Sequence, residues 1–95
     1  MIVDDEAGIR DLLSEALSEK GFDVTSAKDG RESLRYMRKI AFDLLITDIN
    51  MPNLNGIELL KRMKTAGRKE KVVIMTGGLL TGRTLPKISL IYISS

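Results

Sequence analysis

Apolar residues recur along this chain with a helical period in some stretches and as short continuous runs in others. Ile9, Leu13 and Leu17 repeat at helical spacing, which predicts an amphipathic helix over residues 7–20. The same spacing predicts two further helices, over residues 31–40 and 56–65. Their expected inward-facing residues are Leu34, Met37 and Ile40 in the first, and Ile57, Leu60 and Met63 in the second.

Short apolar runs between these segments predict strands. They are residues 1–3, 22–26, 44–47, 72–75 and 88–93. Strands that alternate with helices of about ten residues are typical of βαβ units, in which a parallel sheet carries helices on both faces. We therefore expect one α/β domain over residues 1–95, with the strand at 44–47 buried on both sides.

The C-terminal part of the pattern is unusual. Only residues 77–87 separate the last two predicted strands, whereas a parallel crossover usually needs about a dozen residues or more and a helix. This connection contains three glycines and a proline, which disfavour a helix. We expect the fourth helix to be missing or reduced, and residues 79–95 to be rearranged or exchanged with a partner in a homodimer.

Composition narrows the function. The chain has 95 residues, of which 43% are hydrophobic and 29% charged, as in a small globular domain. It contains no Cys and no His, which excludes disulfides, thiolate chemistry and a histidine base supplied by the chain. The net charge is only +2, and no aromatic residues interleave with the basic stretch at 61–71, so we expect no nucleic-acid partner. No membrane span or signal peptide is recognisable, and we expect a cytoplasmic protein.

Acidic residues follow two of the predicted strands. Asp4, Asp5 and Glu6 come directly after the first apolar run, and Asp48 comes after the run that ends at Thr47. Because the carboxyl ends of parallel strands share one edge of a sheet, where ligands bind in such folds, these carboxylates are expected to converge. Several carboxylates together suit Mg²⁺. An aspartate after a strand is also a common helix cap, which is the simpler interpretation of Asp4 taken alone.

Two other acidic motifs do not fit. A calcium loop that starts at Asp48 would need Gly at its sixth position and Glu at its twelfth, where this chain has Asn53 and Leu59. A phosphatase with an aspartate nucleophile and a second aspartate two residues later as the acid would need a carboxylate at Asn50.

Four segments in combination resemble the receiver domain of bacterial two-component response regulators. They are residues 2–6, 43–52, 55–56 and 73–77. The resemblance extends over residues 1 to about 78. It implies a flavodoxin-like (CheY-like) α/β fold, a three-layer parallel sheet that is truncated here.

The resemblance also implies a function. Receiver domains are phosphoacceptors rather than enzymes, and they take a phosphoryl group from a histidine kinase or a phosphotransfer protein onto an aspartate, which corresponds to Asp48. The implied Mg²⁺ ligands are Asp5, Asp4 through water, Asp48 and the backbone carbonyl of Asn50. The implied switch hydroxyl belongs to Thr76.

One departure from the family concerns a lysine that normally follows the fifth strand. Ser95 stands at the corresponding position, and Lys87 precedes the strand, which would place it at the opposite edge of a parallel sheet. Tyr92 corresponds to an aromatic switch residue. Two alternatives therefore stay open: a degenerate receiver that acts as a non-catalytic interaction or dimerisation module, and a fragment of a longer regulator.

Overall fold

The computed structural model describes residues 1–49, 51, 53–75 and 91–93, and the side chains of these residues up to Met75. The elements in chain order are β1 (Ile2–Val3), α1 (Ala7–Glu19), β2 (Ser26–Ala27), α2 (Gly30–Met37), β3 (Leu44–Asp48), α3 (Gly56–Thr65), β4 (Lys71–Met75) and β5 (Ile91–Ile93). Strands and helices alternate as predicted as far as β4.

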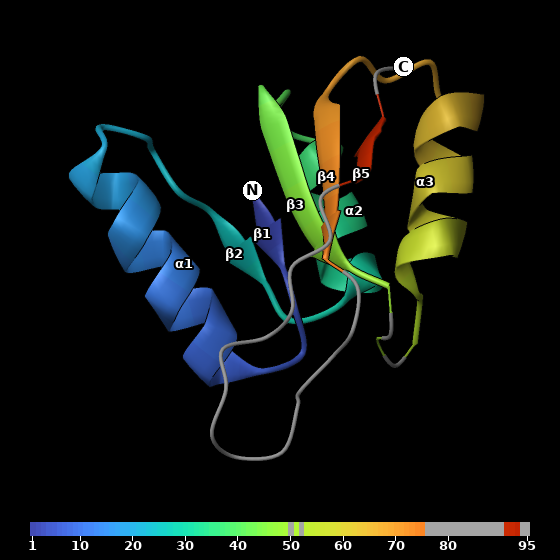
Figure 1. Cartoon of the computed structure of the whole chain (residues 1–95). Helices are drawn as coiled ribbons and strands as arrows, with labels where there is room; N and C mark the ends of the chain where they lie inside the picture. Colours follow the sequence, from blue (N-terminus) through green and yellow to red (C-terminus); the bar gives the residue numbers. More distant parts are fainter. Residues whose placement is uncertain (50, 52, 76–90, 94–95) are drawn as a thin grey trace.

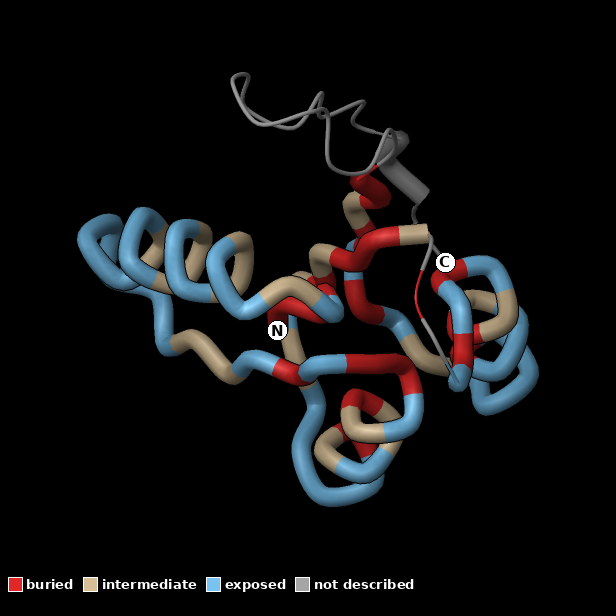
Figure 2. The backbone as a smooth tube through the Cα atoms, turned by 90° about the horizontal axis from the view of Figure 1, so that it is seen from below, coloured by how far each residue is buried: buried red, intermediate tan, exposed pale blue. Residues whose placement is uncertain are grey.

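The strands form one sheet in the order β2-β1-β3-β4-β5, and the first four are parallel. Helix α1 lies on one face of this sheet, and α2 and α3 lie on the other (Figures 1 and 2). The predicted α/β architecture, three layers around a parallel sheet, is therefore confirmed. No helix within the described ranges is both long and apolar enough to cross a lipid bilayer.

Strand β5 departs from the parallel order. It pairs with β4 in the antiparallel sense, with Tyr92 opposite Val73, and its described residues, Ile91–Ile93, fall within the predicted run over 88–93. An antiparallel neighbour needs no crossover helix, so a short connection is sufficient. The expected loss of the fourth helix concerns residues 77–87, which lie outside the described residues, as does Lys87. The placement expected for Lys87 assumed that β5 is parallel to β4, and that assumption is wrong.

The better-packed face of the sheet is the one under α2 and α3. Leu45 of β3, and Val72 and Ile74 of β4, are buried there together with Leu59 and Met63 of α3. Side chains alternate between the faces of a strand, so every second residue contributes to this core. Packing against α2 and α3 therefore holds the strands in place on this face.

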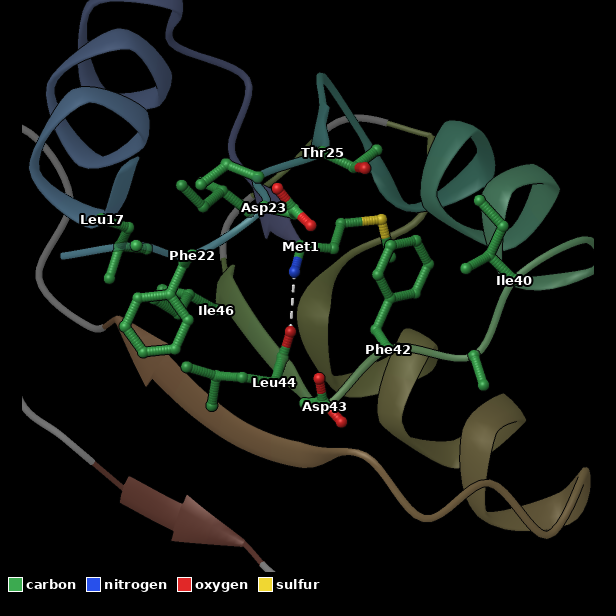
Figure 3. A pocket seen from close by; sticks show the side chains of 14 residues that line it. Met1, Leu17, Phe22, Asp23, Thr25, Ile40, Phe42, Asp43, Leu44 and Ile46 are labelled. Atoms are coloured by element: carbon green, nitrogen blue, oxygen red, sulfur yellow. Dashed lines mark hydrogen bonds between the residues drawn. The ribbon is translucent and has the colours of Figure 1, made fainter. Parts of the chain in front are cut away.

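The opposite face is covered only by α1 in the described part of the chain. Leu44 and Ile46 are half-buried on this side, and α1 contains no buried residue. A cavity of about 510 Å³ lies between Leu17, Phe22 and Leu44, at the amino ends of the strands (Figure 3). In the same view, the Met1 ammonium donates a hydrogen bond of 2.7 Å to the Leu44 carbonyl.

Three details differ from the predicted elements. Strand β2 is Ser26–Ala27 rather than 22–26, because β1 offers it only two residues to pair with. Helix α2 ends at Met37, which leaves Ile40 52% exposed instead of inward. Helix α3 has the predicted bounds and Met63 is buried as expected, but Leu59 is buried as well while Ile57 is 44% exposed.

A partly buried ion pair lies at the amino end of the sheet. The Arg68 guanidinium contacts the Glu70 carboxylate and donates to the carbonyls of Met37 and Ile40 at 2.7 and 3.1 Å. Glu70 also accepts from the Phe42 amide at 3.0 Å. Burial by itself would raise the pKa of Glu70, but the hydrogen bonds from Arg68 and Phe42 outweigh it and lower that pKa. This contact ties the end of α2 to the start of β4.

We expect Glu70→Gln to lower the free energy of unfolding by about 2–3 kcal/mol at pH 7, because Arg68 would keep a partly buried charge without its partner. The lowered pKa means that the contribution of Glu70 is complete above its ordinary value of 4.5 and is lost as the pH falls through the folded value. Urea unfolding of both proteins measures the difference. Glu58→Gln, which breaks the exposed pair with Arg62, is the matched control and should change stability by less than about 0.5 kcal/mol.

Candidate functional site

The register between β1 and β3 brings the acidic residues together. Val3 is the partner of Thr47 in the parallel ladder, so Asp4 and Asp48 follow at the same level on neighbouring strands. Asp4 is 4% exposed and Asp48 is 7% exposed, whereas Asp5 is open to solvent. One carboxylate oxygen from each of the three lies within 4.8 Å of the others. The predicted convergence is confirmed for these three residues.

The loop from β1 to α1 is held by its own polar groups. Asp4 accepts a hydrogen bond of 2.8 Å from the Glu6 amide, and its backbone carbonyl accepts one of 2.7 Å from the Arg10 guanidinium. The N-cap of α1 is Glu6, which makes no side-chain capping bond. Asp4 therefore fixes the approach to the helix without capping it, and Arg10 is a contributor that the sequence pattern alone did not single out.

The loop after β3 is closed over the end of the strand. The Gly56 amide donates to the Ile49 carbonyl at 3.0 Å. A Cβ atom at position 56 would lie 2.5 Å from the Asp48 carbonyl oxygen, so only glycine allows this approach. Asn55 then caps α3 by accepting from the Glu58 amide at 2.9 Å. These contacts turn the chain sharply beside Asp48.

The three carboxylates repel one another in the metal-free chain. Burial raises the pKa of Asp4 to about 6, and the neighbouring charges of Asp48 and Asp5 add to this, against a lowering by the Glu6 amide. Because the ionised form of such a buried, crowded carboxylate is disfavoured, a bound cation would stabilise it strongly. The electrostatics of the site are those of an anionic cluster suited to positive charge.

The donor set fits a hard divalent cation. All three groups offer carboxylate oxygens, which Mg²⁺ prefers, and the exposed Asp5 leaves the cluster accessible from solvent. The other predicted site residues, Asn50 and Thr76, lie outside the described residues. The structure therefore brings together three of the five predicted residues.

Comparison with known proteins identifies the family. A family profile described as the response regulator receiver domain matches residues 1–80. The chain belongs to the response regulator receiver domain family. Members of this family are phosphoacceptor domains of two-component signalling systems.

Curated receiver proteins are similar to this one over 76 residues. Sporulation initiation phosphotransferase F of Bacillus subtilis is 41% identical, over 80% of this chain and 61% of the relative. Transcriptional regulatory protein FixJ of Bradyrhizobium diazoefficiens is also 41% identical, over 80% of this chain and 37% of the relative. The receiver chain thus spans about three fifths or less of the length of these two relatives.

Solved receiver structures share the fold. Response regulator TrrA from Thermotoga maritima, crystallised in complex with Mg²⁺-BeF, has a TM-score of 0.75 at 36% identity, covering 80% of this chain and 66% of that one. Chemotaxis protein CheY4 of Vibrio cholerae has a TM-score of 0.73 at 35% identity, covering 84% and 68%.

We expect Asp4→Asn to stabilise the metal-free receiver by about 2 kcal/mol at pH 7, because the ionised carboxylate is held in an environment that disfavours it. Since the folded pKa is raised from 3.8 to about 6, the penalty is complete above pH 6 and disappears as the pH falls toward 4. The wild-type and variant unfolding curves, measured in EDTA, should therefore converge in acid. Asp5→Asn, at the exposed position, is the control and should have a smaller effect; equal stabilities at pH 7 for wild type and Asp4→Asn would contradict the account.

Proposed function

We propose that Asp48 is the phosphoacceptor of this receiver and that Asp4, Asp5 and Asp48 hold the Mg²⁺ that the reaction needs. The observation that carries the proposal is the meeting of three carboxylates, from two separate strand ends, within 4.8 Å. A response regulator of the same fold was crystallised with Mg²⁺ and a beryllium fluoride group, which supports the cofactor.

The chemistry requires a positioned carboxylate. A carboxylate is ionised at neutral pH under ordinary conditions and is therefore a ready nucleophile. An Asp48 oxygen forms the new bond to phosphorus while the bond from phosphorus to the donor's nitrogen breaks, and the donor imidazole keeps that electron pair. Positioning and charge neutralisation dominate the catalysis of phosphoryl transfer. The closed loop beside Asp48 supplies the positioning.

The proposed Mg²⁺ ligands are the three carboxylates and one backbone carbonyl group. Asp5 would bind directly, Asp4 through water, and the Asn50 carbonyl would complete the protein ligands. When bound, Mg²⁺ offsets the repulsion between the carboxylates and the incoming phosphoryl group. Thr76 would contact the modified Asp48 as the switch hydroxyl. The donor would be a histidine kinase or a phosphotransfer protein in the cytoplasm.

Acetyl phosphate tests the acceptor without a cognate kinase. Incubation with Mg²⁺ should add the mass of one phosphoryl group to the intact chain, and peptide mapping should place it on Asp48. Asp48→Asn should abolish the adduct, and omission of Mg²⁺ should slow its formation by at least about 10-fold. Phosphorylation of Asp48→Asn to the wild-type extent would contradict the proposal.

A second function is supported by the C-terminal part of the chain. The family match ends at residue 80, and β5 runs from the carboxyl end of β4 toward its amino end, away from the acidic cluster. A receiver without the usual lysine would be a degenerate module that binds partners without productive phosphotransfer. Failure to form any adduct, while Mg²⁺ binding persists, would favour this function.

Self-association through β5 is the remaining part of the proposal. The antiparallel pairing with β4 would be remade identically if two copies exchanged their C-terminal segments. The short connection is no longer an argument for exchange, since an antiparallel strand returns within one chain. Light scattering at increasing concentration should reveal a dimer, and Tyr92→Pro, which removes a backbone donor from β5, should reduce it. If the protein is still monomeric at a concentration of roughly several hundred micromolar, the proposed self-association is contradicted.

A further inference from the structure

We infer that Asn53, anchored by the buried carboxylate of Asp29, positions the loop after Asp48 for cation binding. The inference rests on the proposed function and deepens it. It assigns a role in the metal site to a side chain pair that lies outside the acidic cluster.

The anchor is a direct contact between distant parts of the chain. The Asn53 amide donates a hydrogen bond of 3.0 Å to one oxygen of Asp29, 24 positions earlier in the chain. The other oxygen of Asp29 accepts from the Glu32 amide at 2.8 Å and caps α2. Asp29 is only 6% exposed, and the Glu32 bond comes first among the causes that lower its pKa. The carboxylate is therefore ionised, rigidly held by α2, and shared between the helix and the loop.

The backbone of Asn53 shows why the contact needs this residue type. Its φ is +68°, in the left-handed region, and Asn53 is the one non-glycine residue with positive φ within the described residues. Asparagine and glycine tolerate this conformation, but only asparagine also offers an amide. The two requirements, a turn and a donor, are met by one side chain.

A second contact joins the same two elements. A Cβ atom at Gly30 would lie 2.6 Å from the Leu54 carbonyl oxygen, so the first residue of α2 sits directly against the loop. Leu54 is itself buried in the core. The loop is thus pressed onto the amino end of α2 by packing and held there by the Asn53 bond.

The loop between β3 and α3 is held at two points near the acidic cluster. One end is tied to β3 through the Gly56 amide and the Ile49 carbonyl, at 3.0 Å. The Asn53 bond restrains the middle of the loop. Groups that orient ligands from outside the coordination shell typically change metal affinity 10- to 100-fold when they are removed, and a contact one step further away should change it less.

Magnesium titration of the full 95-residue chain by calorimetry tests the inference. Asn53→Gly keeps the positive φ and removes the amide, and Asp29→Ser keeps a capping oxygen for α2 and removes the acceptor for Asn53. Each variant should bind Mg²⁺ about 3- to 10-fold more weakly than the unchanged chain. The double variant should be no weaker than the weaker single variant, within about twofold, because both remove one bond.

Glu70→Gln is the control for a purely structural effect. It lowers stability at the amino end of the sheet and should leave the Mg²⁺ affinity unchanged. Wild-type affinity in Asn53→Gly, or losses that multiply in the double variant, would overturn the inference while the proposed function stands. Absence of Mg²⁺ binding to the unchanged chain would overturn both.

Discussion

The parallel pairing of β1 with β3 is the constraint on which the rest of this structure depends. Only two residues of β1 take part, Ile2 opposite Ile46 and Val3 opposite Thr47, yet this register sets Asp4 beside Asp48. A backbone hydrogen bond of 2.9 Å from the Ile46 amide to the Met1 carbonyl holds this pairing. On its other side, β1 is held to β2 by a bond of 3.1 Å from the Asp4 amide to the Ala27 carbonyl. A slip of one residue would turn every side chain of β1 to the other face and separate the carboxylates. The position of the acidic cluster therefore depends on the shortest of the central strands.

Stability and function are placed at opposite ends of the sheet. At the carboxyl ends, like charges are crowded and the pKa of Asp4 is raised to about 6, which is a local cost to the folded state. At the amino ends, Arg68 and Glu70 form a compensated pair, and Met1 is tied to Leu44. The core under α2 and α3 holds both ends in place. This division lets an unfavourable charge cluster persist in the folded chain.

Much of the fold was predictable because local signals agreed with tertiary packing. The helical spacing at 56–65 predicted the bounds of α3, and the acidic residues after two apolar runs predicted the cluster. Two of the three residues expected to face inward from α3 do so, since Met63 is buried and Leu60 is partly buried against the core. Ile57 is exposed instead and Leu59 is buried, because periodicity shows an apolar stripe without showing which part of it the neighbouring elements cover. The antiparallel direction of β5 was missed because an apolar run carries no information about strand direction. The bond from Asn53 to Asp29 is non-local, and a turn residue gives no sign of it in the sequence.

The proposed function requires that Asp4, Asp5 and Asp48 share one cation. Substoichiometric Mn²⁺, which accepts oxygen ligands as Mg²⁺ does, should broaden the amide resonances of Asp5, Glu6 and Ile49 first in an NMR titration. Resonances at the amino ends of the strands, such as those of Phe22 and Leu44, should stay sharp, and excess Mg²⁺ should reverse the broadening. Broadening spread over all exposed carboxylates, or centred away from the acidic cluster, would contradict the shared site.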